Sequence, residues 1–351
     1  MGGPAAFERV EFAGGELTQV HDAQFIAHVQ QTIARSLHAQ CGVHRGRAAV
    51  VVPPLPISPE ARHAATIRSG PFLVSEKVDG VRYMIVLFTA FVHKRWHKLC
   101  VLSGRNANTY IVPLVIGERL FTHGCVFDGE LVRDWDGTWT LLVFDTYMYE
   151  GTVVSKRSFI ERASCFQRFV EESYRYTPSD PFHMVAKRFT SLRLVNHAFV
   201  QRMLDNDAQA RTYPYPTDGI IVMHSMSGVQ SGTCKTIFKF KVTHTVDLYF
   251  DATSGVLSSV GSERPLRTPH LTVDPAPDWM RDGDIVECAL AWDAPAERMT
   301  ITPMHVRRDK SDANSSWVVE RTMQTVKDAL QIDQLIAPVI STHAEGDDVS
   351  L

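Results

Sequence analysis

Short apolar runs, each interrupted by one or two charged residues, dominate the chain from about residue 72 onward. Runs rich in β-branched and aromatic residues and separated by Gly or Asp predict strands. Apolar residues at helical spacing predict helices. The expected strands are 72–78, 81–93, 98–104, 125–132, 138–148, 219–225, 236–242, 283–292 and 297–309, and the expected helices are 21–41, with Asp22 as N-cap, 155–173 and 194–207.

The two ends of the chain differ from this middle part. Residues 1–20 are rich in Gly and Ala, and we expect them to be loose. Residues 51–63 form a proline-rich connector. After about residue 249, short strands separated by turns suit a small barrel with a closing helix at 316–332. The acidic segment 336–351 is typical of disorder.

Composition limits the classes of protein. The chain has 351 residues, 44% of them apolar, and a net charge of −3, so any contact with nucleic acid must come from a local basic patch. Its six cysteines are scattered without a CxxC pair, which argues against a zinc site and a disulfide framework and favours a reducing compartment. No apolar run has the length of a membrane span. We expect a soluble, intracellular protein without a membrane partner.

The stretch "SEKVDGVRY", residues 75–83, places Lys77 inside an apolar strand. One interpretation is an exposed lysine at a strand end, followed by Asp79-Gly80 as a hairpin turn. The other is a nucleophile, because burial and nearby cations lower the pKa of a lysine from about 10.4 and free its lone pair. The stretch alone leaves both open.

Other charged residues recur where strands should be apolar. Each group also has a purely structural interpretation: DGE and TDG as turns, FKFK as a solvated edge strand, and VRRDK as a solvated loop. Together, however, carboxylates that hold a divalent ion and lysines that hold phosphates describe one site on a sheet. The residues are Asp128 and Glu130 in "VFDGELV", Asp218 in "PTDGIIVM", Lys239 and Lys241 in "IFKFKV", and 306–310, "VRRDK".

The ordered series K-x-D-G-x-R, S-G-R, F-D-G-E, T-D-G-I-I, K-F-K and R-x-D-K spans residues 72–330 and resembles the covalent nucleotidyltransferases. That superfamily contains the mRNA capping guanylyltransferases and the ATP-dependent polynucleotide ligases. The details resemble a capping guanylyltransferase, because Asp218 opens the "TDGII" motif where ligases usually have Glu. "FKFKVTHTVDLYF" and "GDIVEC…MHVRRDKSDAN" are also similar to capping patterns.

The resemblance implies an α+β fold. Residues 1–60 would be an N-terminal extension, and 61–248 a nucleotidyltransferase domain with antiparallel sheets and flanking helices. Residues 249–335 would be an OB-fold barrel with its closing helix, ahead of the tail at 336–351.

The resemblance also implies an activity. The protein would form a lysine–GMP intermediate from GTP with Mg²⁺ or Mn²⁺ and pass GMP to the 5′-diphosphate end of RNA. A local basic surface would recognise the RNA by its phosphates and first nucleotides. An RNA triphosphatase, a cap methyltransferase or RNA polymerase II would be its protein partners, and it would be nuclear.

The site residues follow from the same motifs, position by position. Lys77 would be the nucleophile, Lys239 and Lys241 would bind the α-phosphate, and Asp218 would coordinate the metal. The residues implied in nucleotide binding are Glu76, Arg82 and Glu130 (both on the ribose hydroxyls), Arg105 (near the phosphates or the RNA end), Phe144 (stacking on guanine), Lys187 (guanine O6), Asp247 (supporting the site), and Arg307, Asp309 and Lys310 (the β- and γ-phosphates).

The sequence departs from the family pattern in places, and two other functions stay open. Phe240 replaces the usual Trp between the two lysines, Val242 the usual Pro, and His305 an expected Arg, which weakens the expected grip on the pyrophosphate end. An ATP-dependent polynucleotide ligase would use the same lysine. A non-catalytic RNA 5′-end binder would keep only the fold.

Overall fold

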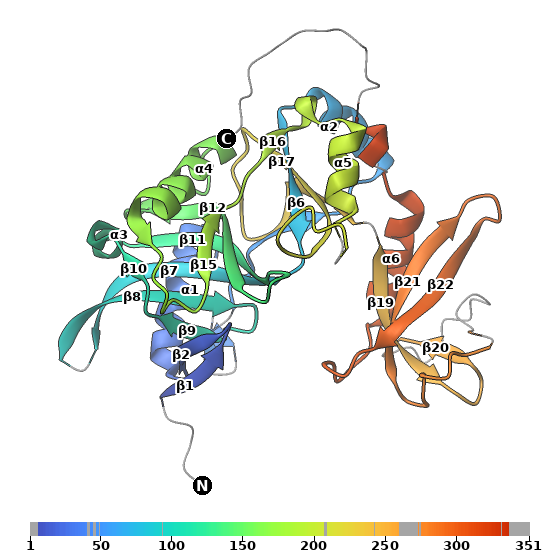
Figure 1. Ribbon diagram of the computed structural model, residues 1–351, viewed down its shortest axis with the longest axis horizontal. Coiled ribbons are helices and arrows are strands. Elements are labelled where there is room, and N and C mark those ends of the chain that lie inside the picture. The colour runs from blue at the N-terminus through green and yellow to red at the C-terminus, as the bar shows by residue number, and fades with distance from the viewer. Residues whose placement is uncertain are drawn as a thin grey trace. The chain divides into compact units, whose positions relative to one another are not determined.

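The computed structural model describes residues 6–336, except 41–42, 45–46, 49, 93, 207–208, 242, 260–272, 274 and 331 (Figure 1). The chain forms two compact units. The first consists of Met1–Ile57, Thr66–Lys239 and Leu335–Leu351, and the second of Ser58–Ala65 and Phe240–Gln334.

The first unit is built on a nine-stranded sheet with the order β1-β2-β9-β8-β7-β11-β12-β13, in which β15 also pairs with β12. The β12–β15 pair is parallel and the other neighbours are antiparallel. The strands are β1 Phe7–Phe12, β2 Gly15–Val20, β7 Val81–Val92, β8 Arg95–Gly104, β9 Thr109–Val112, β11 Cys125–Arg133, β12 Trp139–Tyr149, β13 Thr152–Val153 and β15 His183–Ala186.

A separate five-stranded sheet contains β6, the strand that carries Lys77. Its order is β16-β6-β17-β18-β5. Its strands are β5 Pro54–Ile57, β6 Phe72–Val78, β16 Thr190–Ser191, β17 Thr217–His224 and β18 Gly232–Lys241.

Asp79 and Gly80 connect the two sheets. β6 pairs with β16 and β17, whereas β7 pairs with β8 and β11, so the interpretation of this dipeptide as a hairpin turn is wrong. A Cβ atom added to Gly80 would lie 2.5 Å from the backbone oxygen of Leu131. Glycine is therefore required here because the chain passes directly against β11.

Helices cover the sheets of the first unit, and the expected ones are present. Asp22 caps α1 as predicted, accepting a hydrogen bond of 2.7 Å from the Phe25 amide. Ser158 and Glu161 form a capping box at the start of α4. The helices are α1 Ala23–Ser36, α2 Ala64–Ser69, α3 Glu118–His123, α4 Phe159–Arg168, which continues as a π-helical turn Phe169–Ser173, and α5 His197–Leu204.

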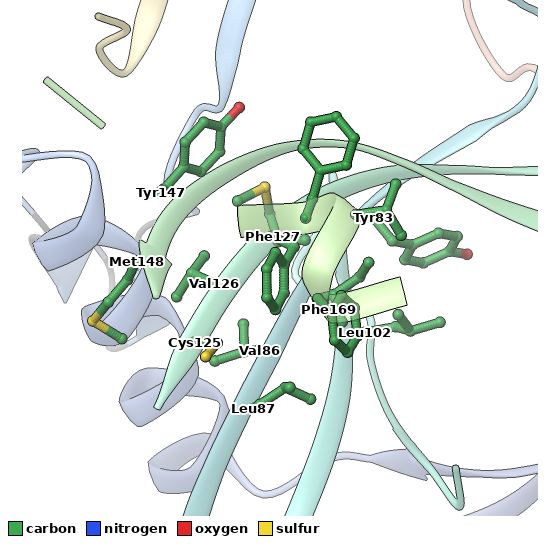
Figure 2. Close-up of a cluster of buried hydrophobic side chains, with 14 of the residues drawn as sticks. Tyr83, Val86, Leu87, Leu102, Cys125, Val126, Phe127, Tyr147, Met148 and Phe169 are labelled. Atoms are coloured by element: carbon green, nitrogen blue, oxygen red, sulfur yellow. The ribbon is translucent and has the colours of Figure 1, made fainter. Parts of the chain in front are cut away.

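The core of this unit lies between the large sheet and these helices. Phe127 of β11 stacks on Phe169 with ring centroids 4.2 Å apart, and both side chains are fully buried (Figure 2). The remaining short elements of this unit are β3 Val43–His44, β4 Arg47–Ala48, β10 Val115–Ile116, β14 Tyr174–Arg175 and the 3₁₀ turn Leu192–Leu194, whereas the 3₁₀ turns Ala61–His63 and Ile332–Gln334 belong to the second unit.

The expectation that residues 1–20 are loose is wrong for the part that the structure describes. β1 and β2 form an antiparallel hairpin around Ala13 (φ 51°) and Gly14 (φ 90°), and β2 extends the large sheet by pairing with β9. Leu17 and Val20 are each only 2% exposed. Burial of these two side chains holds the hairpin in place.

The second unit is a four-stranded antiparallel sheet with the order β20-β19-β21-β22 and a helix, α6. Val319 of α6 is fully buried in the core of this sheet. These features confirm the predicted α+β class with antiparallel sheets and a C-terminal OB-fold. The expected tail beyond Ile336 lies outside the described residues. The elements are β19 His244–Asp251, β20 Val256–Ser258, β21 Ile285–Asp293, β22 Arg298–Val306 and α6 Ser316–Asp328.

Candidate active site

Lys77 forms an ion pair with Asp218 across two neighbouring strands. The register of β6 and β17 shifts between Thr217 and Gly219, so that Gly219 (φ 145°) stands opposite Lys77 and Asp218 sits in a bulge. Bulges re-aim side chains, and here the Lys77 Nζ lies 2.5 Å from an Asp218 carboxylate oxygen. The two side chains are 21% and 27% exposed. Lys77 is thus held at a partly buried site and is not a freely solvated lysine.

β18 adds Lys239 and Lys241 beside β17. Phe238 and Phe240 are 3% and 7% exposed, whereas the lysines between and after them are half-buried, so both lysines lie on one face of the strand. β18 lies between β17 and β5 in the sheet order, and its pairing with β5 ends at Phe238↔Ile57, so the FKFK stretch begins where that pairing ends. Lys239 closes the first unit, and Lys241 already belongs to the second.

Phe144 of β12 has two cations against its ring. The Arg82 guanidinium lies 5.4 Å and the Lys187 ammonium 5.9 Å from the ring centroid. Asp128 fixes Arg82 by a two-pronged ion pair, with 2.9 Å from Nε to Oδ1, and the Pro54 carbonyl accepts a third bond of 2.9 Å. Burial works against the charge of Arg82, but Asp128 outweighs it and raises the pKa of the guanidinium. This half-buried ring is a preformed surface for a flat base.

A buried hydrogen bond joins Lys187, directly after β15 of the nine-stranded sheet, to Glu76 on β6 of the five-stranded sheet. Lys187 is 6% exposed, and its Nζ donates to the Glu76 carbonyl at 2.6 Å. Burial lowers the pKa of Lys187, although Glu76 and Glu130 oppose that shift. The Glu76 carboxylate, 3.9 Å from Lys187, accepts a 3.0 Å bond from the Tyr215 hydroxyl. Glu76, expected to bind nucleotide, is therefore engaged with protein groups.

Glu130 stands opposite Arg82 in the pairing of β11 with β7. Burial raises the pKa of its carboxyl, and the positive charges of Lys187, Lys77 and Arg82 act against that rise. Glu130 is thus electrostatically coupled to Lys77 and to both cations that face Phe144.

The structure also shows two buried carboxylates, Asp128, which the sequence analysis grouped with the site without giving it a role, and Asp145, which it did not name. Asp128 and Asp145 stand opposite each other on β11 and β12, and both are at most 1% exposed. Asp128 also accepts a hydrogen bond from the Tyr147 hydroxyl, and Asp145 pairs with Arg162 at 2.7 Å. The signal was present in "FDGE" and "FDTY", because an Asp inside an apolar strand requires a buried partner.

In the second unit, the carboxylate of Asp247 forms ion pairs with two residues of the R-x-D-K motif at 307–310. The Asp247 carboxylate binds Arg307 at 3.2 Å and also Lys310. Arg307 further pairs with Glu287 at 3.0 Å and Asp309 at 2.7 Å. Arg307 is 21% and Asp309 65% exposed, so this turn lies at the surface and is also held by a connected ion-pair network.

Two more residues complete this network. Asn314 exchanges two 2.8 Å bonds with the backbone of Asp247, which explains why an Asn follows the R-x-D-K motif. His305 lies 3.4 Å from Glu287, the same carboxylate that Arg307 uses. The sequence analysis missed Glu287, although its motif "GDIVEC" was noted.

Arg105 is exposed in the loop between β8 and β9. Within the described ranges, its side chain has no hydrogen bond or ion pair, so the structure does not bring it to the other site residues.

The carboxylate of Asp218 fits a divalent cation. Among the described residues, no three His, Cys, Asp or Glu side chains gather into a metal site. Mg²⁺ nevertheless needs only one or two protein carboxylates when substrate phosphates supply further oxygens. Asp218 provides one such hard oxygen donor next to the lysine. No helix in the described part of the chain is long and apolar enough to cross a membrane.

A partly buried strand lysine paired with a carboxylate, and an aromatic ring with two cations against it, are the features that the sequence motifs predict for a nucleotidyltransferase site. Residues 17–243 match the model of the mRNA capping enzyme, catalytic domain, and residues 243–336 that of the mRNA capping enzyme, C-terminal domain. The chain belongs to the mRNA capping enzyme family.

The solved structures that are similar to the chain include several DNA ligases. A Lig E DNA ligase is 15% identical with a TM-score of 0.40, over 73% of this chain and 100% of that one. Mycobacterial DNA ligase D is 16% identical with a TM-score of 0.42, over 74% and 96%. The ATP-dependent DNA ligase of bacteriophage T7 is 14% identical with a TM-score of 0.37, over 72% and 80%.

Proposed function

We propose that the protein is an mRNA guanylyltransferase that joins GMP to Lys77 and then transfers it to the 5′-diphosphate end of RNA. The observation that carries the proposal is the Lys77–Asp218 ion pair. It places a strand lysine and a candidate metal ligand together in a chain of the capping family. Phe144, with Arg82 and Lys187 against its ring, would receive the guanine.

In the first step, the unprotonated Nζ of Lys77 attacks the α-phosphorus of GTP. A P–N bond forms, the bond from that phosphorus to the bridging oxygen breaks, and pyrophosphate leaves. The lysine ammonium releases one proton before the attack and one after it. Lys239 and Lys241 neutralise charge on the α-phosphate, since such transfers depend mainly on positioning and electrostatics.

Asp218 would hold Mg²⁺ or Mn²⁺ together with phosphate oxygens, and the ion would offset the negative charge of the triphosphate. Arg82 and Glu130 would bind the ribose hydroxyls. Because Asp128 and the Pro54 carbonyl already anchor the guanidinium, Arg82 would be preorganised for this contact.

In the second step, an oxygen of the RNA 5′-diphosphate attacks the same phosphorus. The P–N bond breaks, and Lys77 regains its protons from solvent. Arg307, Asp309 and Lys310, with His305 where an Arg is usual, would orient the outer phosphates of GTP. We further propose that the protein acts in the nucleus beside an RNA triphosphatase, a cap methyltransferase or RNA polymerase II.

The deciding experiment incubates the protein with α-labelled GTP or ATP and a divalent cation, followed by mapping of the labelled residue. We expect an acid-labile label from GTP on Lys77, loss of it in Lys77→Arg, and normal labelling in Lys235→Met, which alters an exposed lysine on β18. Labelling by ATP alone would mean a ligase. No label with either nucleotide, together with RNA binding, would mean a non-catalytic binder.

A further inference from the structure

The strands β7 and β8 continue as a two-stranded ribbon beyond the large sheet. β11 pairs with β7 only as far as Leu87, and β9 pairs with β8 only from Cys100. Pairs from Phe88↔Leu99 to Val92↔Arg95 therefore have no third strand beside them. Figure 1 shows the two strands running out together from the sheet.

Two large aromatic side chains stand exposed near the end of this ribbon. Phe91 and Trp96 are directly opposite each other, with ring centroids 5.4 Å apart. They are 61% and 70% exposed, and no other exposed large apolar side chain among the described residues exceeds 64%. Rings left this open in a ribbon cover little apolar surface of the protein itself.

Basic residues adjoin the two rings along the chain. Lys94 turns the ribbon with a φ of 64°, and Arg95, His97 and Lys98 follow, all exposed. In the part of the chain that the structure describes, neither Lys94 nor Arg95 has an ion-pair partner, whereas Lys98 pairs with Glu118 of α3.

The sequence around the ribbon contains basic residues but no acidic ones. Acidic residues make up 39 of 351 positions, yet residues 80–117 contain no Asp or Glu. Of the basic residues in the same stretch, Lys94, Arg95 and Lys98 lie on the ribbon, whereas Arg82 is bound to Asp128 and Arg105 lies in the loop between β8 and β9. A chain of net charge −3 thus presents a local cationic arm, the arrangement that attracts a polyanion.

A purely structural role would explain only part of this. A facing aromatic pair does stabilise an isolated ribbon. It does not require the surrounding unpaired cations. Cations beside exposed rings match unpaired nucleotides, whose bases stack on aromatic faces while the phosphates meet Lys and Arg. In a duplex the bases are already stacked on one another, so the rings would contribute little.

We propose that the ribbon formed by residues 88–92 and 94–99 is a docking arm for the single-stranded RNA substrate, downstream of its reacting 5′ end. This inference rests on the proposed function, because it names the surface that holds the rest of the acceptor. Trp96 and Phe91 stack on unpaired bases, and Lys94 and Arg95 contact phosphates. The arm raises affinity for RNA without taking part in the reaction of GTP.

Two variants of the full-length chain separate the contribution of the aromatic ring from that of the positive charges. Trp96→Thr removes the ring and keeps a residue that favours strands. The double variant Lys94→Gln/Arg95→Gln removes two charges. The matched control is Trp317→Ala on α6, another exposed tryptophan with an arginine, Arg321, 5.2 Å from its ring.

The assay measures binding of an unstructured RNA, an RNA duplex of equal length and polyglutamate by fluorescence anisotropy at several salt concentrations. For Trp96→Thr we expect about five- to tenfold weaker binding of the unstructured RNA, the lower range for loss of one stacking ring. For the double variant, the slope of log K against log salt should become shallower by about 1.4, or about 0.7 per phosphate contact. The control should bind like the wild type.

A second measurement keeps this proposal distinct from the proposed function. Formation of the lysine–GMP adduct should be unchanged in both variants. The KM for a long 5′-diphosphate RNA should rise, and that for a 5′-diphosphate dinucleotide should stay constant. Failure of adduct formation in the wild-type protein would refute the guanylyltransferase and leave the binding test intact.

Three results would overturn the docking arm. One is unchanged RNA affinity in both variants. Another is equal weakening for the duplex and the unstructured RNA in Trp96→Thr. The third is that the double variant loses affinity for both RNA and polyglutamate while Trp96→Thr binds RNA like the wild type. The ribbon would then be a general polyanion surface or a site for an acidic protein.

Discussion

Replacing Arg162 by methionine tests the fully buried ion pair that supports the strand of Phe144. Arg162 is 0% and Asp145 2% exposed by side chain, with Nε–Oδ1 at 2.7 Å and a second bond of 3.1 Å. The Arg162 guanidinium also donates at 2.8 Å to the carbonyls of Arg157 and Ser227. Removing the guanidinium therefore leaves one carboxylate and two carbonyls without these donors.

The expected cost is large because the remaining carboxylate stays buried. Breaking a buried pair from one side costs about 3–5 kcal/mol. For a unit of this size, each kcal/mol lowers Tm by about 2–4 °C, so Arg162→Met should melt about 6–20 °C lower. Asp145 directly follows Phe144 in β12, and the KM for the nucleotide should rise as well.

The assay is urea denaturation with a thermal scan of the same samples. Arg162→Met/Asp145→Asn should recover part of the loss, because the double variant contains no buried unpaired charge. Arg157→Met, an exposed arginine just before the same helix, should stay within about 0.5 kcal/mol of the wild type. A loss below about 1 kcal/mol in Arg162→Met would refute the reasoning, and so would a double variant that is less stable than the single one.

Three further outcomes are expected. The folded-state pKa of Glu130 is raised, so the native state keeps a proton that the unfolded chain loses, and wild-type stability falls as pH rises through that window. Glu130→Gln should therefore gain Tm relative to the wild type as the pH rises above 4.5, and a difference independent of pH would contradict this. Gly80→Ala should cost about 1–3 kcal/mol in urea unfolding, because its Cβ would lie 2.5 Å from the Leu131 carbonyl; a neutral substitution would mean that the connection can shift. Asp247→Asn should destabilise the second unit by about 1.5–3 kcal/mol, since it weakens the bonds to Arg307 and Lys310, and an unchanged melting profile would show that the network is not structural.

The local elements were readable from the sequence, whereas their long-range pairing was not. Residues 72–78 form a strand with the predicted bounds, because the run is rich in aromatic and β-branched residues and a Gly or Asp lies just beyond each end. The partner of that strand, β17, lies some 140 positions away, since Lys77 and Asp218 are 141 residues apart. No local pattern specifies such a pairing.

The errors have identifiable physical causes. The Asp79-Gly80 pair is a common turn signal, but the steric limit at Leu131 shows that its glycine is needed for close passage between sheets. For residues 7–20, the Gly and Ala content outweighed the apolar residues Leu17 and Val20, which β2 buries. The buried partners of Asp128 and Asp145 depend on tertiary packing, and only the need for such partners was visible in advance.

The two-residue connection between β6 and β7 has a consequence for how the protein can vary. Only five positions separate Lys77 from Arg82, so a fully extended chain would keep them within about 18 Å. Most surface connections accept inserted residues with little penalty. An insertion after Val78 would instead lengthen the tether between the nucleophile and the guanidinium that faces Phe144. Natural length variation should therefore be confined to other segments, and this one should keep a constant length among relatives.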